Sequence, residues 1–262
     1  RENSLLTIKN VKTGETYQEN YTSLVLAPGA KPIRPPLPGI DLPGIFALRT
    51  IPDSRKIRSW IEEHQVKRAV IVGGGFIGLE MAENLHQRGL QVTLIEAQNQ
   101  IMTPLDPEMV EPINQLLNDK KIELQLGDPV AEFSKKDNHL QVKTKLGKIY
   151  DTDLVILGIG VTPENTLAKE AGLEIGKRGG IRVNEKMQTS DPKIWAVGDV
   201  IEVQNYISKE WEHIPLASPA NRQGRVAADA ICDRPTTFRG VQATAICGAF
   251  DAVIATTGLN EK

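Results

Sequence analysis

The stretch RAVIVGGGFIGLEMAENLHQRGLQVTLIEA, residues 68–97, places three consecutive glycines between two runs of different character. The run before the glycines, residues 68–72, is apolar and rich in β-branched residues, which is typical of a buried strand. After them, residues 76–88 repeat apolar side chains every four positions, which predicts a helix that Gly89 ends in a left-handed conformation. A second strand follows at residues 91–95. The stretch therefore predicts strand, glycine turn, helix and strand, the repeating unit of an α/β fold.

The glycines fit the dinucleotide-binding pattern G-x-G-x-x-G at Gly73, Gly75 and Gly78, with Gly74 as an additional glycine. Glycine clusters are common at turns, so the pattern gains its weight from lying between a strand and a helix. Gly73 permits the tight turn, Gly75 lets a pyrophosphate approach the backbone, and Gly78 lets the helix pack on the strand. The amides of the first helical turn would then face two phosphates, whereas the alternative interpretation is a plain turn.

Glu96 ends the second strand, 18 residues after Gly78. A carboxylate there can accept hydrogen bonds from a ribose diol but repels a 2′-phosphate, and residues 96–102 hold no arginine or lysine. We therefore expect NADH rather than NADPH, with a solvated strand end as the alternative. The segment GLEIGKRG, residues 172–179, is not a phosphate-binding loop, because its glycines are too close and Arg178 replaces the required Ser or Thr.

The sequence on both sides of this stretch extends the α/β pattern. Residues 4–27 predict a hairpin that leads into a buried strand at residues 23–27. A helix is predicted over residues 52–63, and two alternating runs precede an apolar strand at residues 153–158. This order predicts a doubly wound, Rossmann-like sheet with an inserted antiparallel meander, bounded at residues 49–160.

Two further helices are predicted from their caps. One begins after Asp106 with Pro107 at its first position, although Pro112 would kink it or move its start toward residue 111. Its predicted apolar face consists of Met109, Ile113, Leu116 and Leu117. The other takes Ser218 as N-cap and Pro219 at its first position.

Composition limits the classes of partner. A net charge of −2 without a basic cluster disfavours nucleic acid and anionic lipid, so small molecules are the expected partners. The longest uncharged apolar run, residues 69–79, is shorter than the roughly 18 to 20 residues that span a bilayer. The first residues do not resemble a secretory signal, so a cytoplasmic location is expected. Cys232 and Cys247 form no CxxC pair, so neither a disulfide framework nor a local redox pair is expected. The four histidines are scattered, so no metal site is expected.

Three further stretches resemble FAD enzymes of the pyridine nucleotide-disulfide oxidoreductase family. YTSLVLAPGAKP, residues 21–32, resembles the strand and turn often written ATG. MQTSDPKIWAVGD, residues 187–199, resembles the second flavin motif, and PLASPANRQGRVAADAI, residues 215–231, resembles the helix after it. With GGGFIGLEMAE between them, the resemblance covers essentially all 262 residues and is closest to the CoA-disulfide reductase branch.

The resemblance implies roles for residues outside the glycine turn. Asp199 would bind the ribitol of FAD, and Gly198 would permit close approach. The helix starting near Leu216 would point its amino terminus at the flavin pyrimidine, with Ala217 in contact. Glu80 matches an acid that pairs with a lysine near the reactive flavin nitrogen and is the one catalytic candidate, an ordinary exposed helix glutamate being the alternative.

Two positions differ from the family pattern. Phe76 stands where the family commonly has a tyrosine that gates nicotinamide, so it can gate but cannot donate a hydrogen bond. Pro28 stands where the ATG motif has threonine, so a hydroxyl contact is lost there. The remaining positions expected to bind a cofactor are Ala27, Gly29, Ile77, Ile159 and Gly160.

The family's first G-x-G-x-x-G and its redox-active cysteine do not occur in this sequence, and neither Cys232 nor Cys247 matches that cysteine. We therefore expect a chain truncated at both ends. The predicted domains are a first FAD-binding part (1–48), an NAD(H)-binding domain (49–160), a second FAD-binding part (161–235) and the start of an interface domain (236–262).

The resemblance implies an FAD-dependent NADH:disulfide oxidoreductase, a flavoprotein that reduces CoA disulfides or persulfides. The cofactors would be FAD and NADH, and the parent enzyme would be a homodimer. Electrons would pass through the flavin to a cysteine absent from this chain, so the chain alone is expected to be inactive. The alternatives are an NADH oxidase or peroxidase of the same family, and an NAD-binding fragment without activity.

Overall fold

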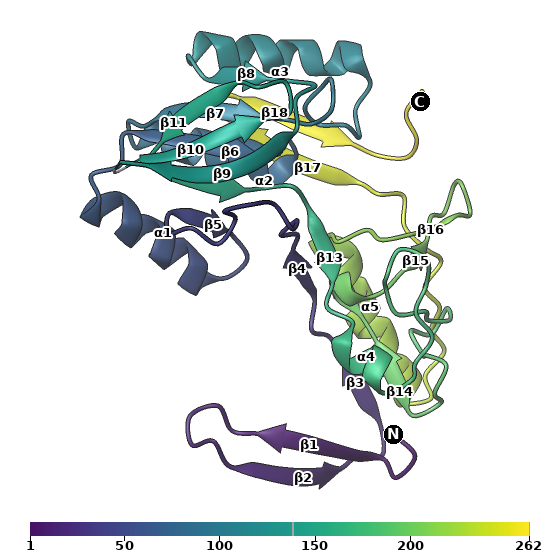
Figure 1. The fold of residues 1–262 in the computed structure, drawn as a ribbon. Helices are drawn as coiled ribbons and strands as arrows, with labels where there is room; N and C mark the ends of the chain where they lie inside the picture. The colour runs from purple at the N-terminus through teal and green to yellow at the C-terminus, as the bar shows by residue number, and fades with distance from the viewer. Residues whose placement is uncertain (138, 262) are drawn as a thin grey trace. The chain divides into compact units, whose positions relative to one another are not determined.

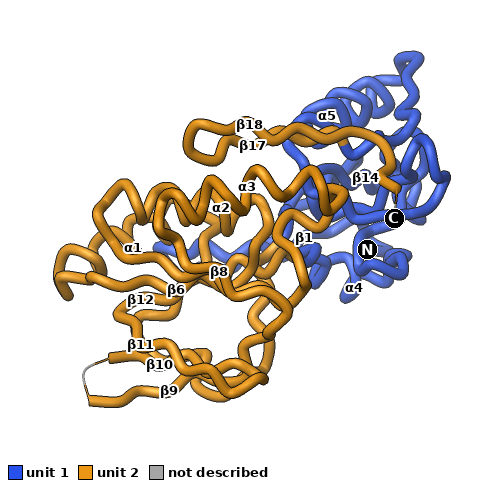
Figure 2. The backbone as a smooth tube through the Cα atoms, turned by 90° about the horizontal axis from the view of Figure 1, so that it is seen from above, with its two compact units in different colours: residues 1–30, 162–243 blue, residues 31–161, 244–262 orange. Residues whose placement is uncertain are grey.

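The computed structural model describes residues 1–137 and 139–261, which form two compact units (Figures 1 and 2). The first unit comprises Arg1–Ala30 and Thr162–Ala243, and the second comprises Lys31–Val161 and the residues from Thr244 onward. The second unit is thus an insertion into the first along the chain, followed by a C-terminal addition. The strands β4 (Ala30–Pro32) and β13 (Val161–Pro163), at the two points where the chain leaves and re-enters the first unit, pair with each other.

The second unit is built on a five-stranded parallel sheet in the order β5-β12-β6-β7-β8, of which β5, β6, β7 and β8 are labelled in Figure 1. Its strands are β5 (Ile45–Ala47), β6 (Arg68–Val72), β7 (Gln91–Ile95), β8 (Glu123–Gln125) and β12 (Leu154–Leu157). The apolar run that opens the quoted stretch forms β6, the middle strand, and is buried after its first residue. A β-branched run that is buried on both faces is what a central parallel strand requires.

Three helices cover one face of this sheet: α1 (Ile51–Glu63), α2 (Phe76–Gln87) and α3 (Pro107–Asp119). Thr50 and Asp53 form a reciprocal capping box at the start of α1, which accounts for the helix predicted over residues 52–63. Gly89 follows the end of α2 with a φ of +82°, in the left-handed conformation predicted for it.

The third helix overturns the later start considered near residue 111 and the place of Met109 on the apolar face, while the kink at Pro112 stays a prediction. It begins at Pro107 as predicted and continues through Pro112, because Pro112 lies on the exposed side, where water can reach the carbonyl that loses its partner. Met109 does not belong to the apolar face: it is 61 % exposed, whereas Val110 is buried. Asp106 precedes the helix without a side-chain capping bond, and its Oδ1 accepts a hydrogen bond from the Glu261 amide.

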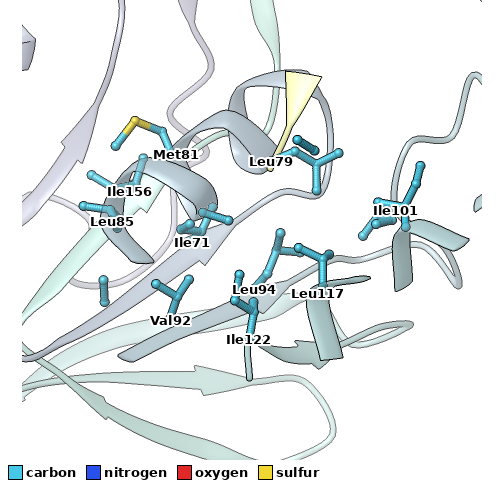
Figure 3. Packing of buried hydrophobic residues seen from close by; sticks show 14 of the residues in the cluster. Ile71, Leu79, Met81, Leu85, Val92, Leu94, Ile101, Leu117, Ile122 and Ile156 are labelled. Atoms are coloured by element: carbon cyan, nitrogen blue, oxygen red, sulfur yellow. The ribbon is translucent and has the colours of Figure 1, made fainter. Parts of the chain in front are cut away.

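The core between the sheet and the helices fixes the position of α2 on the sheet. Ile71 of β6 and Ile156 of β12 contact the α2 face that carries Leu85, while Leu94 of β7 lies beside Leu117 of α3 (Figure 3). These side chains are almost fully buried. Each contributes about 1.5 to 3 kcal/mol of burial free energy, so α2 is held firmly with its amino terminus at the carboxyl end of β6.

The other face of the sheet is covered by the predicted antiparallel meander. It consists of β9 (Val130–Lys136), β10 (His139–Thr144) and β11 (Ile149–Thr152). Phe133 and Val142 from the meander pack against Val70, Val155 and Leu157 of the sheet. The sheet is therefore buried on both faces, as its near-continuous apolar strands predict.

Asp153 ties the meander to the central strand. Burial alone would raise the pKa of the Asp153 carboxyl, but hydrogen bonds from the Lys67 and Arg68 amides, from His139 and from the Arg68 side chain lower it below its ordinary value. A carboxyl whose pKa is lower in the folded protein stabilises the fold above its unfolded-state value, and this contribution is lost as the pH falls below about 4.

We expect Asp153→Asn to lower the free energy of unfolding by about 1 to 2 kcal/mol at pH 7, because a charged acceptor of several hydrogen bonds is lost. The difference from the unmodified protein should shrink as the pH falls from about 4 through the lowered pKa of Asp153, because the carboxyl then becomes protonated in the folded protein as well. Denaturant titrations at pH 7 and pH 3 measure both values. Asp151→Asn, at an exposed neighbour, is the control, and an equal loss at both pH values would contradict the prediction.

The first unit contains short elements around one long helix. Its parallel pair is β3 (Leu24–Leu26) with β14 (Ile194–Ala196), and its helix is α5 (Ala217–Ile231). The remaining elements are β1 (Leu5–Lys9), β2 (Thr16–Asn20), α4 (Thr166–Glu170), the 3₁₀ turn η1 (Gly198–Val200), β15 (Val203–Gln204) and β16 (Trp211–Glu212). Its core gathers β14, η1 and the inner face of α5.

Two expectations for this unit are corrected. The strand predicted as buried at residues 23–27 is only half buried, with Val25 43 % exposed, because β14 is its one partner strand among the described residues. Ser218 is not the N-cap of the last helix; Leu216 takes that position, and Pro219 falls on the third helical residue. Proline is tolerated there because the first amides of a helix have no acceptor within the helix.

The compact units have different bounds from the predicted domains. Residues 31–48, predicted as part of the first FAD-binding segment, lie in the second unit because β5 pairs with β12. The hairpin β17 (Ala245–Ala249) and β18 (Ala252–Thr256), predicted as the start of a separate domain, also lies there. Cys247, Ala249 and Ile254 of the hairpin share one core with α2. Which cofactor each predicted domain binds stays a prediction.

Candidate functional site

The glycine turn lies where β6 ends and α2 begins. Gly73 has a φ of +109°, and a Cβ there would overlap the carbonyl of Gly158, so only glycine fits. A Cβ on Gly78 would overlap the carbonyl oxygen of Gly73, so this glycine lets α2 approach the turn closely. Gly73 donates to the Ile95 carbonyl at 2.8 Å, which ties the turn to the end of β7.

Gly75 differs from the other two glycines of the pattern. It is the N-cap of α2, it makes no side-chain capping bond, and a Cβ there would meet nothing within 4 Å. The amides of Phe76, Ile77 and Gly78 follow it and have no acceptor within the helix. The amino terminus of α2 therefore presents uncapped donors, with the positive end of the helix dipole, at an open backbone position.

Glu96 lies beside this turn and is held at both oxygens. Its Oε2 accepts a hydrogen bond from the Gly74 amide at 2.7 Å, and its Oε1 accepts one from the Gln98 amide at 2.8 Å. A carboxylate has about four acceptor positions, so each oxygen can still accept from a further donor. Half burial and these two bonds fix a negative group next to the uncapped end of α2.

The other residues predicted in the second unit are placed around this end of the sheet or on α2. Ile159 and Gly160 follow β12; Gly160 has a φ of +102°, and its carbonyl accepts from the Ile33 amide at 3.0 Å. Phe76 and Ile77 are half buried against the core. Glu80 is exposed on α2. Exposure is compatible both with a catalytic acid and with an ordinary helix glutamate, so its catalytic role stays a prediction.

In the first unit, the predicted flavin residues cluster at the ends of β3 and β14. Gly198 starts η1 with a φ of +79°, and its amide donates to Oε1 of Gln223 at 2.7 Å. Asp199 follows, half buried, and its carbonyl lies 2.8 Å from Nε2 of His213. Gly29, after β3, has a φ of +77° and accepts from the Glu164 amide at 2.9 Å.

The helix α5 packs against η1 and begins beside it. Leu216 is its N-cap without a side-chain bond, and Ala217 is its first residue, exposed. Ala27, at the end of β3, is also exposed. The structure therefore brings Gly198 and Asp199 together with the uncapped amino terminus of α5 within one unit.

Sequence reasoning missed the residues that support these positions. Gln223 is 2 % exposed and holds the Gly198 amide, and His213 contacts the Asp199 carbonyl. The signal for Gln223 was present: it lies four residues before the buried Ala227 on the apolar side of α5. A polar residue on a buried helix face needs a hydrogen-bond partner, which marks it as a structural contact.

Neither cysteine lies in these clusters. Cys232 is exposed at the end of α5, and Cys247 is buried in β17. Burial, with Glu80 and Glu83 nearby, raises the pKa of the Cys247 thiol, so it stays protonated and weakly nucleophilic at neutral pH. Among the described residues there is no group of three or more potential metal ligands. No helix in the described ranges is both long and apolar enough to cross a membrane.

Comparison with known proteins gives relatives over nearly the whole chain. An NADH oxidase of Methanocaldococcus jannaschii is 43% identical over 249 residues, and the CoA-dependent NAD(P)H sulfur oxidoreductase of Pyrococcus abyssi is 40% identical over 252. Both alignments cover 95% of this chain but 55% and 56% of the relatives, so the chain spans about half the length of the curated relatives it matches. Reduced CoADR-RHD of Bacillus anthracis is 47% identical, with a TM-score of 0.96 over 99% of this chain and 47% of that chain.

The profile of the pyridine nucleotide-disulphide oxidoreductase family matches residues 1–224. The relatives of this chain include an FAD-dependent oxidoreductase from Desulfovibrio vulgaris and the NADH oxidase of Methanocaldococcus jannaschii, in agreement with the predicted cofactors. The predicted α/β fold is confirmed by the parallel sheet and by the solved relatives. The chain belongs to the pyridine nucleotide-disulphide oxidoreductase family, which confirms the resemblance seen in its sequence.

Proposed function

We propose that this chain supplies the NADH site and part of the FAD site of an NADH:disulfide oxidoreductase that acts on CoA disulfides or persulfides. The observation that carries the proposal is the carboxylate of Glu96, fixed at both oxygens beside an uncapped, unobstructed helix terminus. A carboxylate beside free amides matches two neighbouring parts of NADH: the ribose hydroxyls, which need an acceptor, and the phosphates, which need donors.

The geometry of the glycine turn fits a dinucleotide. Gly75 leaves open space at the N-cap of α2, where any side chain would fill the approach to the backbone. The helix dipole and the free amides would bind the pyrophosphate, with a charge interaction of about 0.3 to 1 kcal/mol per charge, more where it is partly buried. Glu96 would accept from the ribose hydroxyls with its remaining acceptor positions.

The cluster in the first unit fits part of a flavin nucleotide. Gly198 and Gly29, both with positive φ, leave backbone without side chains beside Asp199, whose carboxylate can accept from ribitol hydroxyls. The amino terminus of α5 at Ala217 would stabilise negative charge placed before it. Bound there, FAD would supply a hydride acceptor for NADH and a route for the electrons to the final acceptor.

The proposed acceptor is supported by the relatives. The Pyrococcus abyssi protein is a CoA-dependent sulfur oxidoreductase, and a persulfide reductase from A. fulgidus is 35% identical with a TM-score of 0.96. The NADH oxidase of Methanocaldococcus jannaschii, 43% identical, favours oxygen as a second candidate acceptor. A cytoplasmic location, a homodimeric parent, and the inactivity of the chain alone stay predictions from the sequence.

The acceptor is tested with the protein isolated from its native source, by following NADH consumption at 340 nm. Anaerobic consumption that requires CoA disulfide or CoA persulfide, with release of free thiols, is the expected result. Consumption that requires air and is indifferent to the CoA compounds would replace the proposal with an NADH oxidase.

The NADH site is tested with Glu96→Ala. We expect NADH to bind about tenfold more weakly, because the ribose loses a charged acceptor, while NADPH binds no more weakly than before. Titration of nucleotide fluorescence gives both dissociation constants. Glu108→Ala, an exposed carboxylate at the start of α3, is the matched control, and an unchanged NADH affinity in Glu96→Ala would remove the basis of the site.

A further inference from the structure

Two buried polar side chains lie behind Glu96, at the end of the neighbouring strand. Gln125 ends β8 and is 8 % exposed, and Asp128, three residues later, is 0 % exposed. Burying a carboxylate is strongly unfavourable unless hydrogen bonds compensate for the lost water. The glycine pattern and the flavin motifs assign no role to either residue.

The backbone of this segment is joined to the segment that carries Glu96. The Glu96 amide donates to the Gln125 carbonyl at 2.8 Å, and the Asp128 amide donates back to the Glu96 carbonyl at 3.3 Å. The Gly127 amide donates to the Gln98 carbonyl at 2.8 Å. Residues 96–98 and 125–128 are therefore paired beyond the end of the sheet, so a displacement of one segment would strain or break its hydrogen bonds to the other.

The side chains of this segment connect it to the turn between β10 and β11. Asp128 Oδ1 accepts from the Leu146 amide at 2.9 Å, and Asp128 Oδ2 accepts from Gln125 Nε2 at 3.3 Å. Gln125 Oε1 accepts from the Tyr150 hydroxyl at 3.2 Å and from Lys148 Nζ. Burial, with Glu123 and Asp128 nearby, raises the pKa of Tyr150, so its hydroxyl stays protonated and can donate. Each oxygen of Asp128 thus has a donor.

We propose that Asp128 is a positioning residue for nucleotide recognition: through the 125–128 segment it holds Glu96 where its carboxylate meets the NADH ribose. This inference rests on the proposed NADH site. A carboxylate on a fixed backbone accepts from two hydroxyls without a loss of freedom on binding, which favours NADH. The same carboxylate cannot turn away from a 2′-phosphate, so the network also sets the selectivity against NADPH.

Asp128→Ala and the milder Asp128→Asn test the inference, with fluorescence titrations of NADH and NADPH. Alanine removes both acceptors, and we expect NADH to bind about tenfold more weakly and the NADH-to-NADPH affinity ratio to fall about as much. Asparagine keeps an oxygen for the Leu146 amide, so about a threefold loss is expected. Thr152→Val is the matched control. It removes a fully buried hydroxyl of the meander that Asp128 contacts, and this hydroxyl has no bond to residues 96–98 or 125–128.

A double variant separates positioning from general structure. In a Glu96→Ala background, Asp128→Asn should cause no further loss of NADH affinity, because the group that it positions is already absent. A loss as large as in the unmodified background would show that Asp128 does not act through Glu96, and would overturn the inference. The inference would also be overturned if Asp128→Ala and Asp128→Asn both kept the NADH-to-NADPH affinity ratio and the circular dichroism spectrum of the unmodified protein.

The two proposals fail in different ways. If the unmodified protein does not bind NADH, or if Glu96→Ala binds it equally well, the proposed NADH site fails. If Glu96→Ala weakens NADH binding while neither change at Asp128 alters it beyond Thr152→Val, the inference about Asp128 alone fails. Should Asp128→Ala not fold, Asp128→Asn and the double variant still decide the question.

Discussion

Replacement of Gly75 by alanine is expected to weaken NADH binding about 10- to 100-fold while the free energy of unfolding stays within about 0.5 kcal/mol. Its φ of −82° suits any residue, and a Cβ there meets nothing within 4 Å, so the fold has no reason to change. The methyl group instead occupies the space through which a pyrophosphate would reach the amides of α2.

Two titrations decide this prediction: nucleotide fluorescence for affinity and denaturant for stability. Gly224→Ala, in the middle of α5 and also without atoms near a Cβ, is the control and should leave NADH affinity unchanged. If Gly75→Ala binds NADH as tightly as the unmodified protein, then the open space at the N-cap is not where the phosphates lie.

Replacement of Gly78 by alanine is expected to have the opposite profile, a loss of about 3 kcal/mol in the free energy of unfolding. A Cβ there would overlap the carbonyl oxygen of Gly73, a backbone atom that cannot rotate away. Either α2 moves off the sheet or the turn opens, and both disturb the core around Leu79. In an exposed helix the same change normally stabilises by about 0.5 to 1 kcal/mol.

Denaturant titration of Gly78→Ala beside Gly224→Ala measures this contrast directly, since both glycines lie inside helices. The free energy of unfolding is expected to fall in Gly78→Ala and to rise in Gly224→Ala. A neutral or stabilising Gly78→Ala would mean that α2 does not pack on the turn as closely as the structure has it.

The local part of the fold could be predicted from the sequence because its signals lie within a few residues of each other. The strand, turn and helix around Gly73 depend on glycines whose conformations are set by neighbouring atoms. Gly89 likewise takes the left-handed conformation that its position after α2 predicts. The face of α3 was misplaced by one position, Met109 for Val110, because both residues are apolar and only the packing chooses between them.

The long-range contacts could not be predicted. The pairing of β5 with β12 joins residues more than 100 positions apart, and nothing in residues 45–47 indicates it. The sequence placed Glu96 at the end of a strand, but its bond to the Gly74 amide depends on how two loops close on each other. The position of Gln223 on the inner face of α5 indicates burial, but periodicity does not indicate its partner, and Asp128 lies in a loop to which no periodicity applies.

The extra glycine of the triple has a consequence for protein engineering. A redesign toward NADPH would begin by removing the acid at Glu96, yet the Gly74 amide donates to that same acid. A design that removes Glu96 and adds only cations for the 2′-phosphate would leave the Gly74 amide without an acceptor. An unpaired amide costs about 1 to 3 kcal/mol where water cannot reach it. A successful exchange of coenzyme must therefore also bring in a neutral acceptor, such as a serine or asparagine oxygen, for the turn itself.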